Sequence, residues 1–159
     1  LTIFNVFSAR YDNSISPEHI EDCLKVIQAG NLWAYTLRNI VDKEHNFLCQ
    51  DNCESLGKWN TIIHPDDFFV DVNCYFLPKN IAITISPVWY RKFREPGQAE
   101  IDRVIFSVLN RIAPKFDSTY KYSVNYAVGN SSLSVQAGFF LEGNKKMFDK
   151  YNGSFPWRK

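Results

Sequence analysis

The sequence has little of what marks disordered, membrane-spanning or nucleic-acid-binding chains. Glycine and proline occur seven times each and methionine once, which argues against disorder and against a soft, methionine-rich binding surface. No run approaches the ~18 consecutive apolar residues that suggest a membrane helix. The 18 basic and 17 acidic residues leave a net charge of +1, whereas a duplex-binding domain usually has a basic face and a high pI. We therefore expect neither a membrane nor a nucleic acid as partner.

Motifs that would name a reaction are also missing. The chain has no G-x-S-x-G turn around a nucleophilic serine, no glycine-rich phosphate loop and no cysteine in a recognisable catalytic context. It has three histidines, too few for several acid–base roles although one would be enough for an enzyme. The sequence favours a protein that is not an enzyme, and it predicts no cofactor.

What the chain does have is length and aromatic side chains. Its 159 residues fit one domain over 1–159, because domains cluster at roughly 100–150 residues. Folding at this length should bury ~70% of the surface of the unfolded chain. Aromatic residues make up 16% of the sequence, and many of them fall on predicted strands.

The four cysteines bear on the compartment. Cys23 and Cys74 fall on apolar faces of predicted elements, where buried free thiols are common. This favours a reducing compartment, and we predict a cytoplasmic protein. A signal peptide removed from the mature chain would leave the same sequence, so secretion is the alternative.

The first half of the chain predicts a strand, a helix and a second strand. The first strand covers residues 2–8. Ser16 is a good N-cap for the helix, and Gly30 occupies the position of a left-handed C-cap residue. The apolar stripe of the helix is formed by Ile20, Cys23, Leu24 and Ile27. A strand over 32–40 follows, and one of its faces carries Trp33, Tyr35 and Leu37.

Residues 41–67 show no clear period, apart from a possible short strand around Phe47 and Leu48. Irregular stretches of roughly twenty-five residues are unusual inside compact domains and are often functional or stapled. We expect this loop, and the segment before the second helix, to be free working surface.

The second half predicts two hairpins around a helix. Alternation over 68–76, a turn at 77–80 and a return strand over 81–85 form the first hairpin. A helix over 97–113 has its apolar stripe at Ile101, Ile105, Val108 and Ile112, and Val104 and Leu109 widen this stripe. The second hairpin joins a strand over 120–128 to a return strand over 133–139. Residues 142–159 form a polar helical turn or a tail.

Together these elements predict an α+β, single-domain, two-layer sandwich. Close hairpins indicate a mostly antiparallel sheet, and two amphipathic helices are expected to pack on one face of it.

One cluster has the character of a metal site. His45, Cys49, Cys53 and His64 lie in the irregular loop at the spacing H-x3-C-x3-C-x10-H, and zinc binds four such donors as a tetrahedron. The common zinc spacings are C-x2-C and C-x4-C, so we weigh the metal site against a local disulfide and against residues that share no role. The last interpretation is favoured.

His64 is followed by Pro65, Asp66 and Asp67, which offers a base and two carboxylates that can hold a hard cation. A metal-dependent hydrolase built on the loop would use this set. Turn chemistry is the simpler interpretation, because adjacent residues of an extended segment point to opposite sides.

The segment from Trp89 to Arg94 interleaves aromatic and basic side chains. Such residues anchor protein interfaces, and they also bind single-stranded nucleic acid. The competing interpretation places Trp89 and Phe93 over the core, with the basic residues as a solvated rim. The binding residues that we predict are Trp89, Tyr90, Arg91, Lys92 and Arg94, with Asp66 and Asp67.

The predicted strand over 120–128 carries Tyr120, Tyr122 and Tyr126 on one face. Their hydroxyl groups would provide polar handles in the apolar wall of a ligand cavity. Packing of the rings against a helix is the alternative, and it is favoured.

Two resemblances follow from these patterns. The doubled strand–helix–strand–strand order resembles that of several small ligand-binding and regulatory domains. The size, neutrality and aromatic interface candidates resemble those of immunity proteins that neutralise bacterial toxins. We therefore predict first a protein-binding module, such as an inhibitor or immunity-type protein with a protein partner. A small-molecule-binding regulatory domain is the alternative, and a metal-dependent hydrolase is the second alternative.

Overall fold

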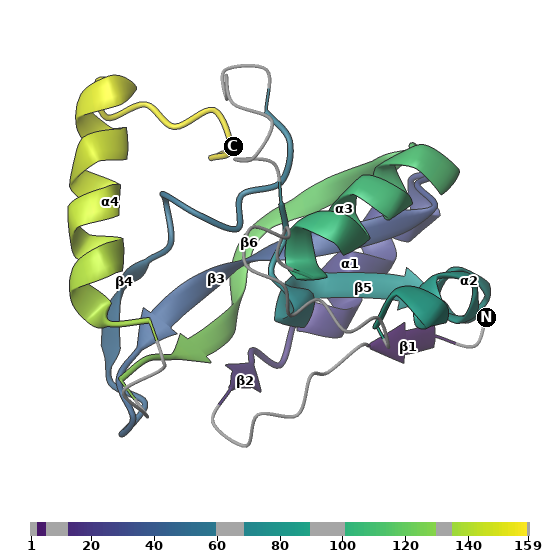
Figure 1. The fold of residues 1–159 in the computed structure, drawn as a ribbon, viewed down its shortest axis with the longest axis horizontal. Helices are drawn as coiled ribbons and strands as arrows, with labels where there is room; N and C mark the ends of the chain where they lie inside the picture. The colour runs from purple at the N-terminus through teal and green to yellow at the C-terminus, as the bar shows by residue number, and fades with distance from the viewer. Residues whose placement is uncertain (1–2, 6–12, 60–68, 90–100, 130–134, 159) are drawn as a thin grey trace.

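The computed structural model describes residues 3–5, 13–59, 69–89, 101–129 and 135–158 (Figure 1). Its strands are β1 (Ile3–Asn5), β2 (Ser14–Ile15), β3 (Trp33–Val41), β4 (Phe47–Gln50), β5 (Tyr75–Pro78) and β6 (Phe116–Ala127). Its helices are α1 (His19–Gln28), the short 3-10 helix η2 (Val72–Cys74), α2 (Lys79–Trp89), α3 (Ile101–Ile112) and α4 (Ala137–Lys150). None of the described helices has the length and apolar character needed to cross a bilayer.

The strands form one sheet in the order β1-β5-β3-β6-β2, with β4 also paired to β3. Among the described strand pairs only β3 and β6 run parallel. The α+β class and the mostly antiparallel sheet are therefore confirmed. The central strand β3 is buried along nearly its whole length, because β6 covers one edge while β5 and β4 pair with opposite ends of the other.

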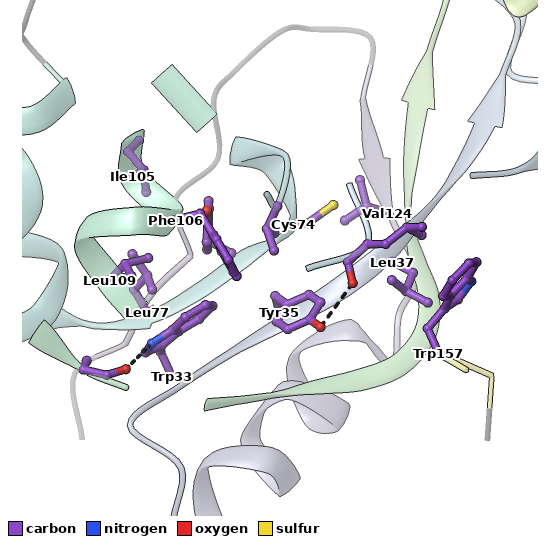
Figure 2. Packing of buried hydrophobic residues seen from close by; sticks show 14 of the residues in the cluster. Trp33, Tyr35, Leu37, Cys74, Leu77, Ile105, Phe106, Leu109, Val124 and Trp157 are labelled. Carbon is purple, nitrogen blue, oxygen red and sulfur yellow. Dashed lines mark hydrogen bonds between the residues drawn. The ribbon is translucent and has the colours of Figure 1, made fainter. Parts of the chain in front are cut away.

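The helices lie on both faces of the sheet, and not on one face as expected. Trp33 belongs to a core cluster with Ile105 and Leu109 of α3, as Figure 2 shows. The next residue of β3, Ala34, packs instead with Cys23 of α1. Successive side chains of a strand point to opposite faces, so α1 and α3 enclose β3 between them (Figure 1).

Helix α1 confirms one of its predicted caps. Gly30 has φ +93° and its N–H donates to the carbonyl oxygen of Ile27, as expected for a left-handed residue after a helix. The helix begins at His19, however, and Ser16 is not its N-cap. The main-chain N–H of Ser16 instead donates to the carbonyl oxygen of Ser123 at 2.8 Å, so Ser16 joins the start of α1 to β6.

The predicted first hairpin is wrong in its second half. Strand β5 is only four residues long, and residues 79–89 form helix α2 in place of a turn and a strand over 81–85. Ile81 and Ile85 are four positions apart, so they satisfy a helical period as well as the alternation of a strand. Both pack on the main core cluster while Ile83 is 60% exposed. The packing of α2 against α3 selects the helix over the strand.

The predicted second hairpin is also wrong in its second half. Strand β6 is confirmed, but residues 137–150 form helix α4, so no return strand covers 137–139. Phe140 of α4 is fully buried against Ile40 and Val128. The segment after α4 returns to the main core cluster, where the rings of Phe155 and Trp157 stack at 5.0 Å between centroids. The sequence predicts a polar helical turn or a tail there. The burial of Trp157 corrects the expectation of a polar tail.

Part of the loop predicted over 41–67 is core and not working surface. Strand β4 confirms the short strand around Phe47 and Leu48. Beyond it, Asp51, Ser55 and Leu56 are buried. Most of this loop segment, residues 51–59, is therefore buried or partly buried, and only Lys58 is exposed.

Helix α4 is seated on this loop segment through Gly143. A Cβ atom added to Gly143 would lie 2.5 Å from the Sγ atom of Cys53. We expect Gly143→Ala to displace α4 and to lower the free energy of unfolding by about 1–3 kcal/mol, as overpacking does. Urea unfolding measures this change. Gly138→Ala is the matched control, because a Cβ atom there meets nothing within 4 Å; an equal loss in both variants would contradict the proposed contact.

Candidate functional site

The structure locates few of the predicted site residues. Trp89 ends α2 and is partly buried against the main core cluster, which agrees with a core role for its ring. The other predicted binding residues, Tyr90, Arg91, Lys92, Arg94, Asp66 and Asp67, lie outside the described residues. An interface at that segment stays a prediction.

The predicted metal site also stays a prediction, because His64 lies outside the described residues. His45 is exposed at a turn with φ +65°. Cys49 and Cys53 are partly buried beside Ile40, and both are free thiols. Within the residues that the structure describes, no three His, Cys, Asp or Glu side chains gather as metal ligands would.

The described residues form an open depression of about 560 Å³ on the sheet, which we call the polar hollow. The residues that line it belong to α1, β3, β4 and β6 and to the connection between β2 and α1. The lining residues are Ser16, Glu18, Asp22, Asn39, Gln50, Tyr120, Lys121, Tyr122 and Ser123. Two residues of the predicted tyrosine face, Tyr120 and Tyr122, thus belong to the lining of the polar hollow.

Irregular pairing of β6 with β3 creates this wall. Tyr35 pairs with Ser118 and Leu37 with Tyr122, so a two-residue step on β3 spans a four-residue step on β6. Extra residues of this kind form bulges, which bend a strand and redirect its side chains. Tyr120, inside the bulge, has φ +57°, a left-handed conformation that non-glycine residues adopt rarely and often at functional sites.

A buried network of hydroxyl groups holds the bulge in place. The Oγ atom of Ser123 lies 2.8 Å from Nδ1 of His19 and 2.6 Å from Oγ1 of Thr36. Thr36 Oγ1 also donates to the carbonyl oxygen of Lys121 at 2.6 Å. The first residue of α1 and the middle of β3 are thereby tied to the segment of β6 that lines the polar hollow.

Burial lowers the pKa of His19, and the nearby carboxylate of Asp22 opposes this shift only in part. Folding therefore favours the neutral imidazole, whereas the unfolded chain takes up a proton near pH 6.5. Because the unfolded chain binds more protons below that pH, stability should fall as pH drops below about 6.5, by at most about 1.4 kcal/mol per pH unit. Urea unfolding between pH 7.5 and 5.0 measures this slope.

The control for that measurement is His19→Asn, which keeps a polar group near Nδ1 and cannot titrate. We expect a flatter slope for the variant. Asp42 and Glu21 have lowered pKa values, through hydrogen bonds from Asn46 and Lys25 respectively. Their contribution is lost only at lower pH, outside this window. Equal slopes in the two proteins would contradict a buried neutral His19.

The hydroxyl groups of the lining tyrosines are used inside the protein. Tyr120 donates to Oδ1 of Asp117 at 2.8 Å, and Tyr122 donates to Oδ1 of Asn52. These two hydroxyl groups are therefore not available as handles for a ligand, which is the interpretation that the sequence disfavours. Tyr126 lies elsewhere, with the guanidinium of Arg38 4.5 Å from its ring centre.

The sequence analysis did not identify the buried cluster of charges around Arg38. Arg38 is 3% exposed, and its guanidinium binds Asp51 at 2.8 Å, Glu54 at 3.1 Å and also Asp71. These ion pairs tie the loop segment 51–59 and the residue before η2 to the central strand. A signal was present, because an arginine inside the apolar run of β3 needs buried partners. The carboxylates that pair with Arg38 all belong to this chain, so we assign Arg38 a structural role.

Comparison with protein-family models and with curated proteins finds no match to this chain.

Proposed function

We propose that the protein is a ligand-binding module and that the polar hollow takes a small polar molecule. The observation that supports this most is the bulge of β6, which holds Tyr120 in a left-handed conformation at the wall of an open depression. Strained residues persist where the surrounding structure over-determines them. Here His19, Ser123 and Thr36 supply that surrounding structure. The volume also falls in the range of about 300–1,000 Å³ that small-molecule sites occupy.

An NMR screen tests this proposal. Uniformly 15N-labelled protein is titrated with mixtures of sugars, amino acids, amines, nucleosides and organic acids. We expect at least one mixture to shift the main-chain amide signals of Asn39, Lys121 and Ser123 while those of α3 stay in place. The shifts should disappear in Tyr120→Gly, which removes the ring without imposing backbone strain. Shifts confined to other regions, or no shifts at all, would contradict the proposal.

Protein binding is a second candidate, because α4 presents an apolar strip to solvent. Leu141 is 51% exposed and Phe148 is 56% exposed, and residues seven positions apart lie on one side of a helix. A toxin or enzyme that the chain inhibits, as an immunity-type protein would, is the partner that we propose for this strip or for the segment from Trp89 to Arg94.

Binding of the purified products of neighbouring genes, measured by calorimetry, tests this second candidate. Leu141→Glu should weaken a complex formed through α4, whereas Trp89→Ala and Arg91→Ala should weaken one formed through the other segment. Ile83→Glu is the control, since Ile83 is exposed on α2. A partner that tolerates all of these changes would exclude both surfaces.

We also propose a cytoplasmic location. The four cysteines are free thiols, and Cys23 and Cys74 are fully buried. Burial raises the pKa of Cys23 to about 12, so this thiol is a packing group with little thiolate character. Such thiols support a reducing compartment.

A further inference from the structure

We infer that the hydrogen-bonded chain from His19 through Ser123 to Thr36 is a pH-sensitive latch on the polar hollow. The latch holds the bulge of β6 while the imidazole is neutral and releases it when the imidazole takes up a proton. The three side chains join the first residue of α1 to β6 and to β3, and Ser123 itself lines the polar hollow. The consequence for binding, though not the latch itself, rests on the ligand-binding function proposed above.

The acceptors determine the direction of each hydrogen bond in this chain. The carbonyl oxygen of Lys121 only accepts, so the single hydroxyl proton of Thr36 lies toward it, at 2.6 Å. Ser123 must then supply the proton for its own 2.6 Å contact with Thr36. Because a hydroxyl group has one proton, the 2.8 Å contact between Ser123 and His19 uses a proton on Nδ1 of the imidazole. Neutral His19 is therefore the Nδ1–H tautomer, and its Nε2 atom carries the lone pair.

A second proton on this ring would have to bind at Nε2, where the surroundings disfavour it. His19 is fully buried, and no protein group among the described residues makes a hydrogen bond with Nε2. The ring of Phe76 lies beside the imidazole, with 6.4 Å between the two centroids. A buried N–H group without an acceptor is costly. The imidazolium would also stand at the positive end of the α1 dipole, where a cation is unfavourable.

The described groups around His19 supply one charge that opposes this. On α1, the carboxylate of Asp22 raises the pKa of His19, but burial lowers this pKa by more. Cys23, one turn further on, is a buried thiol whose pKa is raised to about 12, so it stays uncharged. The groups from β3, β5 and β6 named above are hydroxyl groups and a phenylalanine ring. Glu18 and Lys121 have exposed side chains on the polar hollow. Asp22 is therefore the group that attracts a protonated ring.

Release of His19 loosens the wall of the polar hollow where its backbone is least regular. Tyr120, three positions before Ser123, has φ +57°, and such a conformation persists only where the surrounding structure over-determines it. Without the bond from α1, this part of β6 can relax. The released imidazole takes up its proton near pH 6.5, whereas the latched one does so at lower pH. Each pH unit below 6.5 should therefore raise the ratio of released to latched molecules by up to about tenfold.

NMR spectra of 15N-labelled protein without ligand, recorded between pH 7.5 and 5.0, test the latch. At pH 7.5 the imidazole of His19, assigned by comparison with His19→Asn, should show a protonated Nδ1 and an unprotonated Nε2. As the pH falls, the main-chain amide signals of Lys121 and Ser123 should follow one titration curve with its midpoint below 6.5. The signals of α3 should stay in place, and His19→Asn should abolish the curve.

A substitution at Asp22 distinguishes a latch from a merely structural contact. Asp22→Asn removes the carboxylate that raises the pKa of His19, so the midpoint should move to lower pH. Glu21→Gln is the matched control, because Glu21 lies on the same helix and is exposed beside Lys25; its midpoint should equal that of the native protein. An unchanged midpoint in Asp22→Asn, an Nε2–H tautomer at pH 7.5, or α3 signals that change together with those of β6 would each overturn the latch.

The outcomes also separate the latch from the proposed function. The NMR screen described above is repeated with the same mixtures at pH 7.5 and 5.5. A mixture that binds the polar hollow at pH 7.5 should bind severalfold more weakly at pH 5.5, but equally at both pH values in His19→Asn. Equal binding by the native protein at both pH values would overturn the action of the latch on the site and leave the ligand-binding function standing. Titration of the latch with no binding by any mixture would support the latch and contradict the proposed function.

Discussion

Replacing Arg38 by alanine is expected to lower the free energy of unfolding by about 3–5 kcal/mol, the usual cost of removing one partner from a buried ion pair. Asp51 and Asp71 would be left buried without their cation. The rings of Tyr126 and Phe140 would also lose the guanidinium that lies against them. Because domains are stable by only about 5–15 kcal/mol, this single change removes a large fraction of the total. Urea unfolding followed by circular dichroism measures it.

A matched control separates burial from charge. Lys43 pairs with Glu44 at 3.4 Å, but both side chains are well exposed, so Lys43→Ala should leave the unfolding midpoint unchanged within error. Should Arg38→Ala fail to fold, Asp51→Asn keeps the shape of one partner and removes its charge. It should still be destabilising, because an amide NH2 group would replace the Oδ2 atom that accepts from Nε of Arg38. A change below about 1 kcal/mol in both Arg38→Ala and Asp51→Asn would contradict the role given to this cluster.

Replacing Trp33 by alanine is expected to lower the free energy of unfolding by about 3–5 kcal/mol, because packing is lost and a cavity is left behind. The indole is fully buried, stacks on Phe116 at 4.2 Å between ring centres, and donates from Nε1 to the carbonyl oxygen of Ala113 at 2.8 Å. It therefore links β3 to the end of α3 and the start of β6. Chemical unfolding and the near-ultraviolet circular dichroism of the aromatic core report the loss.

Trp33→Phe divides that effect into its parts. Phenylalanine keeps most of the ring contact and removes the N–H group, so the expected cost is smaller, about 1–3 kcal/mol for an unpaired buried carbonyl. Near-equal costs for Phe and Ala would mean that the hydrogen bond, and not the packing, dominates. A loss of less than about 1 kcal/mol for Trp33→Ala would contradict the central place of this ring.

The elements predicted correctly are those whose local pattern has a single solution. The apolar run of β3 is too continuous for an exposed helix, and α3 has a stripe at helical spacing that ends before Pro114. The predicted stripe is nevertheless slightly displaced: Ile105 and Leu109 are buried as expected, but Phe106 is buried with them while Ile112 is 44% exposed. Periodicity identified the helix, and tertiary packing set its rotation.

The elements predicted wrongly have patterns with two solutions. Ile81, Ile83 and Ile85 alternate as a strand would, yet Ile81 and Ile85 also share one side of a helix. The segment 137–139 continues an alternation that ends in two phenylalanines, and only the burial of Phe140 beside Ile40 selects the helix. In both cases contacts distant in sequence decide the local structure.

The polar hollow could be predicted only in part. The tyrosines of β6 were identified, but the bulge that brings Tyr120 to the wall depends on pairing with β3. Nothing local marks Tyr120 as left-handed, because glycine or asparagine is the usual signal. His19 was also missed, since its contact with Ser123 joins residues 104 positions apart.

The parallel pairing of β3 with β6 has a consequence for how the chain is made. Asn39 and Asn125, which are register partners, are 86 positions apart, so the central strand β3 leaves the ribosome long before its neighbour β6 is synthesised. Closing so long a loop is slow, and until it closes one edge of β3 offers unpaired N–H and C=O groups to other nascent chains. Yield at high expression should therefore depend on chaperones that shield this strand during synthesis.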